Sequence, residues 1–136
     1  MFDDCKSYAI FLYTLQDEYP EISKSKIHSF TVSQTRSIAY GALYFKNQIE
    51  LRFREEIDCL NAKLLDYYYE IRQYDEKKYF YDPQPHPENS DLAATFPHHK
   101  HILPDIKHNR QPASGISFDK PNLPLLIEEI IKDYLS

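Results

Sequence analysis

Between residues 22 and 81, apolar and polar side chains alternate along the chain, and this pattern most constrains its fold. In Ile49–Ile57, isoleucine, leucine and phenylalanine at the first odd positions alternate with glutamate and arginine at the even positions. Successive side chains of a strand point to opposite faces of a sheet, so the pattern predicts a strand with one buried and one solvated face. A charged helix is the alternative, because glutamate and arginine are good helix formers, but a period of two favours the strand.

Three further segments, residues 26–34, 37–46 and 62–74, show similar alternation, and a short aromatic segment at 78–81 follows a polar turn at 75–78. Short connections between neighbouring strands are typical of antiparallel pairing. The sequence therefore predicts an antiparallel sheet of about five strands in this part of the chain, residues 22–81.

Both ends of the chain carry the 3.6-residue period of an amphipathic helix. The pattern predicts an N-terminal helix within residues 1–20, capped by Asp3 or Asp4, and a C-terminal helix at 122–135, capped by Asn122. The apolar stripe of the C-terminal helix should cover one face of the sheet. The stripes consist of Tyr8, Phe11, Leu12 and Leu15 in the first helix and of Leu123, Leu126, Ile127, Ile130, Ile131 and Tyr134 in the second.

Residues 82–121 contain seven of the nine prolines of the chain. Proline donates no ladder hydrogen bond, so this segment is predicted to be mostly an extended loop, with one short strand around Lys100–Leu103. A loop of this length in a compact protein is usually functional or disordered. The whole chain, residues 1–136, therefore predicts a single α+β domain with a single antiparallel sheet, an N-terminal and a C-terminal helix, and a long Pro/His-rich loop.

The block Phe96–His101 in this loop contains three of the six histidines of the chain. Imidazole titrates nearest neutrality, so a cluster of it suits acid–base chemistry, phosphate contact or metal ligation. If the block is extended, His99 and His101 point to one side, about 6.5–7 Å apart along the strand, while His98 and Lys100 point to the other. Two imidazoles at that spacing could flank a phosphodiester, one taking a proton from an attacking 2′-hydroxyl and the other protonating the leaving oxygen.

This geometry predicts His99 and His101 as the catalytic residues of a protein that acts on RNA, with no metal and no other cofactor. The window 98–110 supports contact with a polyanion, because its lysines and arginine outnumber its single carboxylate, Asp105. The predicted substrate-binding residues are His86, His98, Lys100 and Arg110.

Two other roles for these histidines remain open. The H-x-H spacing is also that of metal ligands on a strand, but a full metal site would need His86, His108, Asp82 or Asp105 to converge on it. The third role is structural, because histidines in proline-rich loops often bond backbone carbonyls and stack on aromatic rings such as Phe96.

The formal net charge of −5 excludes a protein whose whole surface attracts nucleic acid, so any such contact must be local. Cys5 and Cys59 form no C-x-x-C pair, which favours reduced thiols in a cytoplasmic protein, with a single long-range disulfide as the alternative. No apolar run reaches membrane-spanning length, and the first residues lack the basic start of a secretory signal, so no membrane contact is predicted. No sequence feature indicates an oligomeric state.

Several motifs follow one another in a distinctive order. Tyr67–Glu70 is followed by the Tyr81–Asp82 step, by His86–Glu88, by the block Thr95–His101 and by the C-terminal helix at 123–135. This order resembles the TumE-type toxins of bacterial and archaeal toxin–antitoxin pairs. The block from Thr95 is the most specific part of the resemblance, which covers roughly residues 25–135 and leaves the N-terminal helix as an addition.

The resemblance implies a cytosolic protein with a small antitoxin partner, and growth inhibition when the toxin is free. Members of the family typically carry an arginine before the Tyr–Asp step and an asparagine after it, where this chain has Phe80 and Pro83. If that arginine contacts a substrate in the family, the phenylalanine at its position predicts that this chain has lost or altered the family's activity. A non-catalytic relative that binds a partner chain through a sheet edge or an aromatic surface is therefore a second functional hypothesis.

Overall fold

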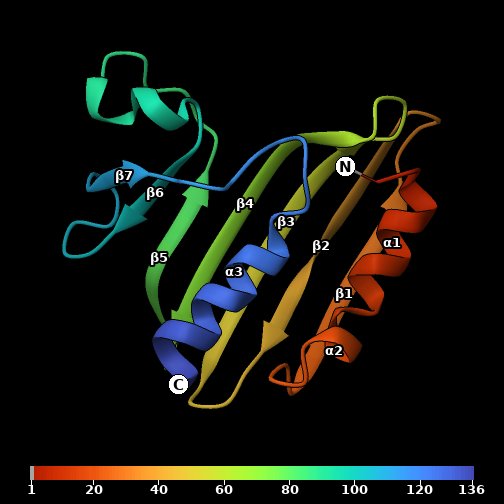
Figure 1. Ribbon diagram of the computed structural model, residues 1–136, viewed down its shortest axis with the longest axis horizontal. Coiled ribbons are helices and arrows are strands. Elements are labelled where there is room, and N and C mark those ends of the chain that lie inside the picture. Colours follow the sequence, from red (N-terminus) through yellow and green to blue (C-terminus); the bar gives the residue numbers. More distant parts are fainter. Residues whose placement is uncertain (1) are drawn as a thin grey trace.

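The computed structural model describes residues 2–136 and contains one antiparallel sheet in which seven strands lie side by side in chain order (Figure 1). Each strand after β1 pairs with the strand that precedes it, as predicted for the short connections between β1 and β5. The strands are β1 (Lys24–Thr31), β2 (Arg36–Tyr44), β3 (Ile49–Asp58), β4 (Lys63–Gln73), β5 (Glu76–Asp82), β6 (His99–Ile102) and β7 (Arg110–Pro112).

The first five strands confirm the sheet predicted from alternation, but the predicted number of about five is wrong. β6 and β7 come from the segment 82–121, in which only one short strand was expected. The prolines of this segment do not interrupt β6, because Pro97 and Pro104 lie on either side of it. Pro112 ends β7, the edge strand of the sheet, where a missing N–H breaks no ladder. A proline-rich segment can therefore still add strands at a sheet edge.

The turn between β4 and β5 also differs from its predicted position at residues 75–78. Tyr74 and Asp75 form it, with φ angles of 52° and 62°. Two consecutive residues with positive φ are typical of the two-residue turns that match the twist of a hairpin. β5 therefore begins at Glu76.

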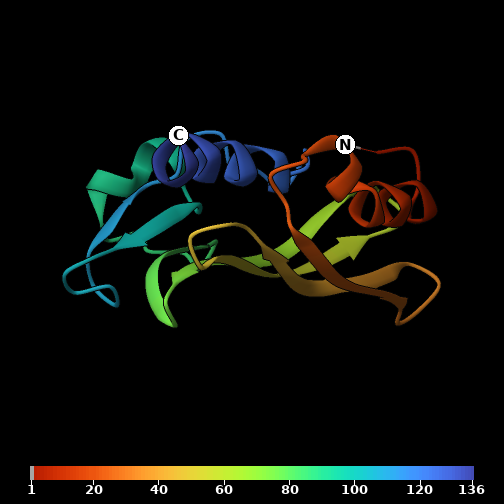
Figure 2. The ribbon, with the colours of Figure 1, turned by 90° about the horizontal axis from the view of Figure 1, so that it is seen from below.

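The helices lie together on one face of the sheet (Figure 2). They are α1 (Cys5–Tyr13), α2 (Leu15–Glu18), a 3-10 turn named η1 (Ser90–Thr95), α3 (Leu123–Ile130) and a final π-helical turn named η2 (Ile131–Leu135). Asp4 caps α1 as predicted, because its side chain accepts a hydrogen bond of 2.7 Å from the Ser7 amide. No helix in residues 2–136 is long and apolar enough to cross a membrane.

The core lies between the helices and the covered sheet face. Leu51, Ile71 and Leu126 are each 0% exposed and belong to one apolar cluster, as expected for a sheet face covered by amphipathic helices. The opposite face carries the charged positions of β3, which confirms the two-sided strand predicted there.

Asn122 does not cap α3 with its side chain, contrary to prediction. Its side chain is buried and instead accepts a hydrogen bond from the Ser117 amide at 3.0 Å and donates to the Ser117 carbonyl and the Tyr69 hydroxyl. Asn122 therefore ties the chain before α3 to the sheet, so that tertiary partners replace the local cap.

Cys5 and Cys59 form a disulfide, with 5.4 Å between their Cα atoms. The sequence favoured reduced thiols, and that expectation is wrong for this structure. The bond joins the start of α1 to the residue that follows β3, which are 54 positions apart in the chain. Pairing two cysteines so far apart depends on how α1 packs, which their spacing does not indicate.

Glu55 is a carboxyl group buried inside the covered face, with 0% exposure. Its two oxygens accept hydrogen bonds from the hydroxyls of Tyr8 on α1 and Tyr69 on β4. Burial raises the pKa of Glu55, and the two tyrosine hydrogen bonds offset only part of that effect.

The raised pKa of Glu55 predicts a loss of stability as pH rises. Below the ordinary pKa of 4.5 the carboxyl is protonated in both states; above it, the unfolded chain releases the proton more readily than the folded protein. We therefore expect the free energy of unfolding to fall, relative to Glu55→Gln, from pH 4.5 up through the folded pKa. Urea unfolding of both proteins between pH 4 and 8 measures this difference, and two parallel curves would contradict the prediction.

Candidate functional site

β6 positions the predicted histidines, because β5 and β7 hold it in register. In that register His99 faces Asp82 and His101 faces Phe80. His99 and His101 point to one side of the strand, and Lys100 points to the other, as the alternation predicts.

Asp82, His99 and His101 converge on one small region and are hereafter called the DHH cluster. The Nε2 atoms of the two rings lie 2.8 Å apart. One carboxylate oxygen of Asp82 lies 3.0 Å from Nε2 of His99, and the other lies 3.4 Å from Nε2 of His101. The ligand atoms of the three residues all lie within 4.8 Å of one another.

The imidazoles of the cluster are buried, with 1% of His99 and 5% of His101 exposed. The loops before and after β6 supply their other contacts. Nδ1 of His99 lies 3.2 Å from the Pro97 carbonyl, and Nδ1 of His101 lies 3.1 Å from the Ile106 carbonyl. A carbonyl oxygen only accepts hydrogen bonds, so both Nδ1 atoms must carry the proton.

This tautomer assigns a lone pair to each Nε2 in the neutral rings. Two lone pairs and a carboxylate would then face one another, an arrangement that needs a proton or a cation between them. Burial raises the pKa of Asp82, but the neighbouring imidazoles of His101 and His99 and the Gln84 amide together outweigh burial and hold the pKa well below the ordinary value of 3.8.

The observed geometry differs from the predicted acid–base pair. The two rings converge as expected, but they are buried and contact each other directly. If a phosphate oxygen or a hydroxyl formed a hydrogen bond with each ring, the two ring nitrogens would lie roughly 5 Å apart. The two Nε2 atoms are only 2.8 Å apart. The pair therefore cannot flank a phosphodiester in this conformation, and the cluster must act as a unit.

Asp82 connects the cluster to solvent, with 21% of its side chain exposed. It lines a groove of about 530 Å³ at the end of β5. The groove combines two carboxylates with aromatic and proline side chains: its lining residues are Leu65, Asp66, Tyr67, Tyr68, Asp82, Pro83, Gln84, Pro85, Pro97 and Phe118.

His98 lies on the helix-covered side, away from the cluster. Its Nδ1 contacts the Tyr67 hydroxyl, and its ring packs between Tyr67 and Phe118. Burial lowers the pKa of His98, which favours the neutral ring with Tyr67 as the donor. His98 borders a neighbouring hollow of about 430 Å³, so its predicted role as a substrate contact stays a prediction.

The other predicted substrate contacts are placed differently. His86 meets His99 edge to face, with 4.8 Å between ring centroids, and Arg110 on β7 lies opposite His101. Lys100 lies over the Tyr79 ring and pairs with Glu129 of α3 at 3.4 Å. The structure therefore brings His86 and Arg110 to the cluster but not Lys100.

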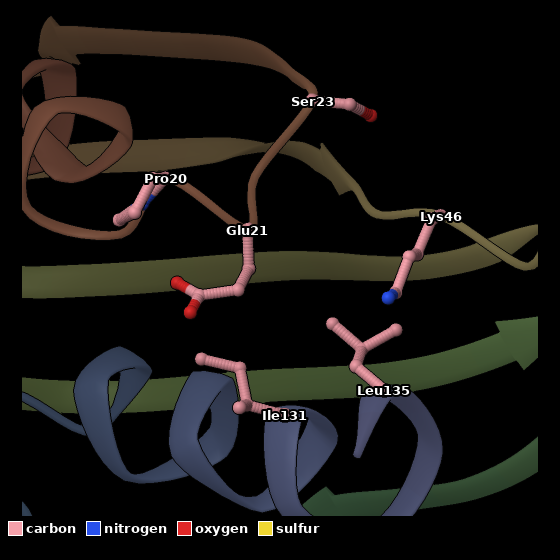
Figure 3. Close-up of a pocket in the computed structure, with 6 residues that line it drawn as sticks. All are labelled: Pro20, Glu21, Ser23, Lys46, Ile131 and Leu135. Atoms are coloured by element: carbon pink, nitrogen blue, oxygen red, sulfur yellow. The ribbon is translucent and has the colours of Figure 1, made fainter.

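A second pocket, of about 570 Å³, lies between the chain before β1 and the C-terminal turn (Figure 3). Ile131 and Leu135 form an apolar side, with Glu21 and Lys46 on the opposite side. Lys46 follows β2, at the end of the sheet opposite to Asp82 (Figure 1). This pocket is therefore separate from the DHH cluster.

Asp82 is the one member of the cluster that the sequence did not assign to the catalytic pair. It was named only as an alternative metal ligand and as part of the Tyr81–Asp82 step. That step was the available signal, because a carboxylate at a strand end next to a predicted histidine strand is a candidate partner for imidazole.

Fold and site together define a small α+β protein with one meandering antiparallel sheet and a buried His–Asp–His cluster beside a groove. The model of the family described as Toxin TumE matches residues 12–134. The chain therefore belongs to the TumE toxin family, as its motifs suggested, and a toxin-like role follows. No curated protein and no solved structure matches the chain.

Proposed function

We propose that this protein is a growth-inhibiting toxin that cleaves RNA and that the DHH cluster is its reactive centre. Membership of a toxin family supports growth inhibition. The observation that carries the chemical part is the convergence of two imidazoles and a carboxylate beside an open groove. Imidazole is the side chain whose ordinary pKa lies nearest neutrality, which suits the proton transfers of phosphodiester cleavage.

The exposed sheet face supports RNA as the substrate. Tyr40, Arg54 and Tyr68 lie opposite one another on β2, β3 and β4, and Tyr68 also lines the groove that holds Asp82. Aromatic side chains stack on bases, and arginine pairs with phosphates, so this row would guide a single strand toward the groove. The overall charge of −5 makes such a local path necessary.

In the proposed reaction, the 2′-hydroxyl oxygen attacks the adjacent phosphorus and the bond to the 5′-oxygen breaks. The cluster accepts the proton of the 2′-hydroxyl through Asp82, its solvent-facing member, and His99 and His101 hold it. The same proton returns to the leaving oxygen. Arg110 and His86 flank the cluster and would contact the phosphate, whereas Lys100 lies on the other face of the sheet.

A small antitoxin protein is the proposed partner, and the cytoplasm is the proposed location, because cellular RNA is found there. The disulfide is unusual for that location, since cytosolic thiols are normally kept reduced. A non-catalytic module that binds a partner chain through a sheet edge or an aromatic surface is the competing function, and the RNA assay separates the two.

The test compares a single-stranded RNA with the same oligonucleotide carrying a 2′-deoxy sugar at every position. We expect the purified protein to cleave the RNA and leave the deoxy oligonucleotide intact, because only RNA has the attacking hydroxyl. Equal cleavage of both would contradict the 2′-hydroxyl mechanism. Growth arrest on induction without any cleavage of RNA would favour the binding module instead.

A further inference from the structure

We propose that Asp82, His99 and His101 bind one divalent transition-metal ion. The inference goes beyond the proposed function, because it concerns the ion alone and holds whether or not RNA is the substrate. The sequence favoured a site without a metal. The metal alternative called for further residues, such as His86 or His108, to converge on the two histidines, whereas the proposed site uses three ligands.

The distances between the donor atoms fit a shared ion. Two ligand atoms that each lie about 2.1 Å from a metal are roughly 3.0 Å apart at a right angle and roughly 3.4 Å apart at the tetrahedral angle. The observed separations are 2.8 Å between the two Nε2 atoms, 3.0 Å from His99 to Oδ1 of Asp82 and 3.4 Å from His101 to Oδ2, which suits a carboxylate that offers both oxygens to the ion. Two imidazoles and one carboxylate on one side of an ion are a known donor set for divalent metals.

The backbone prepares the imidazoles for this role. The Pro97 and Ile106 carbonyls hold the protons of both Nδ1 atoms, which leaves the Nε2 lone pairs free to face the ion. Metal-binding histidines usually donate their other N–H to a carbonyl or carboxylate in this way. The rings are also almost fully buried, so their orientation is fixed before any ion arrives.

An ion resolves the electrostatic conflict of the cluster. Without it, the lone pairs of two Nε2 atoms and a carboxylate oxygen face one another at separations of 2.8 and 3.0 Å, with no hydrogen-bond donor between them. A divalent cation would satisfy all three groups at once. It would also offset the negative charges of Asp82 and Asp66, which would otherwise repel a phosphate from the groove.

Three protein ligands leave coordination positions open, as in catalytic rather than structural metal sites. Asp82 lies at the groove, so an open position would face solvent there. The other predicted ligands stay outside the cluster: His108 is 68% exposed and contacts the carboxylate of Asp105 at 3.1 Å. The exposed pair of His108 and Asp105 therefore provides a matched control for the loss of a histidine that does not belong to the proposed metal site.

The experiment treats the full chain with a chelator, removes it by dialysis and titrates the protein with ZnCl₂ in a calorimeter. We expect one Zn²⁺ per chain, with affinity weakened about 100-fold or more by Asp82→Ala, since even outer-shell changes cost 10–100-fold. His108→Ala should leave the affinity unchanged. Co²⁺ should give visible bands without a thiolate band near the ultraviolet, because Cys5 and Cys59 are bonded to each other.

A second measurement does not depend on the folding of any variant. In nitrogen-15 spectra of the wild-type imidazoles, Zn²⁺ should shift the Nε2 signals of His99 and His101 and leave those of His108 in place. Circular dichroism of Asp82→Ala checks that a lost affinity does not reflect unfolding.

Two outcomes would overturn the inference. A chain that binds no Zn²⁺ holds a shared proton instead, and binding that His108→Ala removes but Asp82→Ala keeps belongs to the exposed Asp105 pair. The result is separable from the proposed function, because no RNA is present. If the chain binds Zn²⁺ but does not cleave RNA, only the proposed nuclease function is rejected. If the chain binds no Zn²⁺ and still cleaves RNA at full rate in excess chelator, only the proposed metal site is rejected.

Discussion

Changing Asp82 to asparagine should lower the rate of RNA cleavage about 100-fold or more and abolish growth inhibition on induction. The change keeps the shape of the side chain but removes its negative charge. Asp82 is the solvent-facing member of the cluster, and its two oxygens lie 3.0 and 3.4 Å from the Nε2 atoms of the buried His99 and His101. Without the carboxylate, the imidazoles lose the group that holds a proton or an ion beside the groove.

Growth after induction and cleavage of a labelled RNA measure the effect. His108→Ala is the matched control, since His108 is also a histidine beside an aspartate but lies on the surface. Circular dichroism and urea unfolding of Asp82→Asn should confirm that the fold remains. If Asp82→Asn remains as toxic as the wild-type chain, the DHH cluster is not the reactive centre.

Replacing both Cys5 and Cys59 by serine should lower the free energy of unfolding by about 4 kcal/mol. A disulfide restricts the unfolded chain more as the loop it closes lengthens, and this one joins residues 54 positions apart. It also ties α1 to the end of β3, so its loss should loosen the helix first. Tyr8 on the same helix would then lose its contact with buried Glu55.

Urea unfolding with and without a thiol reductant measures this contribution. The reductant should lower the stability of the wild-type chain to that of the double serine variant and leave the variant unchanged. Two free thiols in protein that is alkylated at the moment of lysis would show that the bond is absent in the cell. Cys5 lies outside the residues that the family model matches, which begin at residue 12, whereas Cys59 lies inside them.

The family departure at Phe80 also has a structural consequence. Its ring stacks on His101, with 4.0 Å between centroids and 10° between planes. Position 80, where the resemblance leads us to expect an arginine, therefore lies against the cluster in this chain and holds an apolar group instead. The aromatic ring covers one imidazole face, which contributes to the burial of His101.

The sequence predicted the parts of this protein that depend on local geometry. A period of two identified β1 to β4, a short aromatic segment after a polar turn indicated β5, and a period of 3.6 identified the terminal helices, because side-chain direction follows directly from backbone conformation. The same rule correctly placed His99 and His101 on one side of a strand and Lys100 on the other. The motif order also led to the correct family.

Tertiary structure alone decided how far apart the functional groups lie. Register with β5 brought Asp82 to the two histidines, and the loops around β6 buried the rings and fixed their protons through carbonyls. The added strand β7, the disulfide and the pairing of Asn122 with Tyr69 likewise depend on contacts between distant segments. Alternation determines which face a side chain takes, but distances between side chains depend on strand pairing and on what covers them.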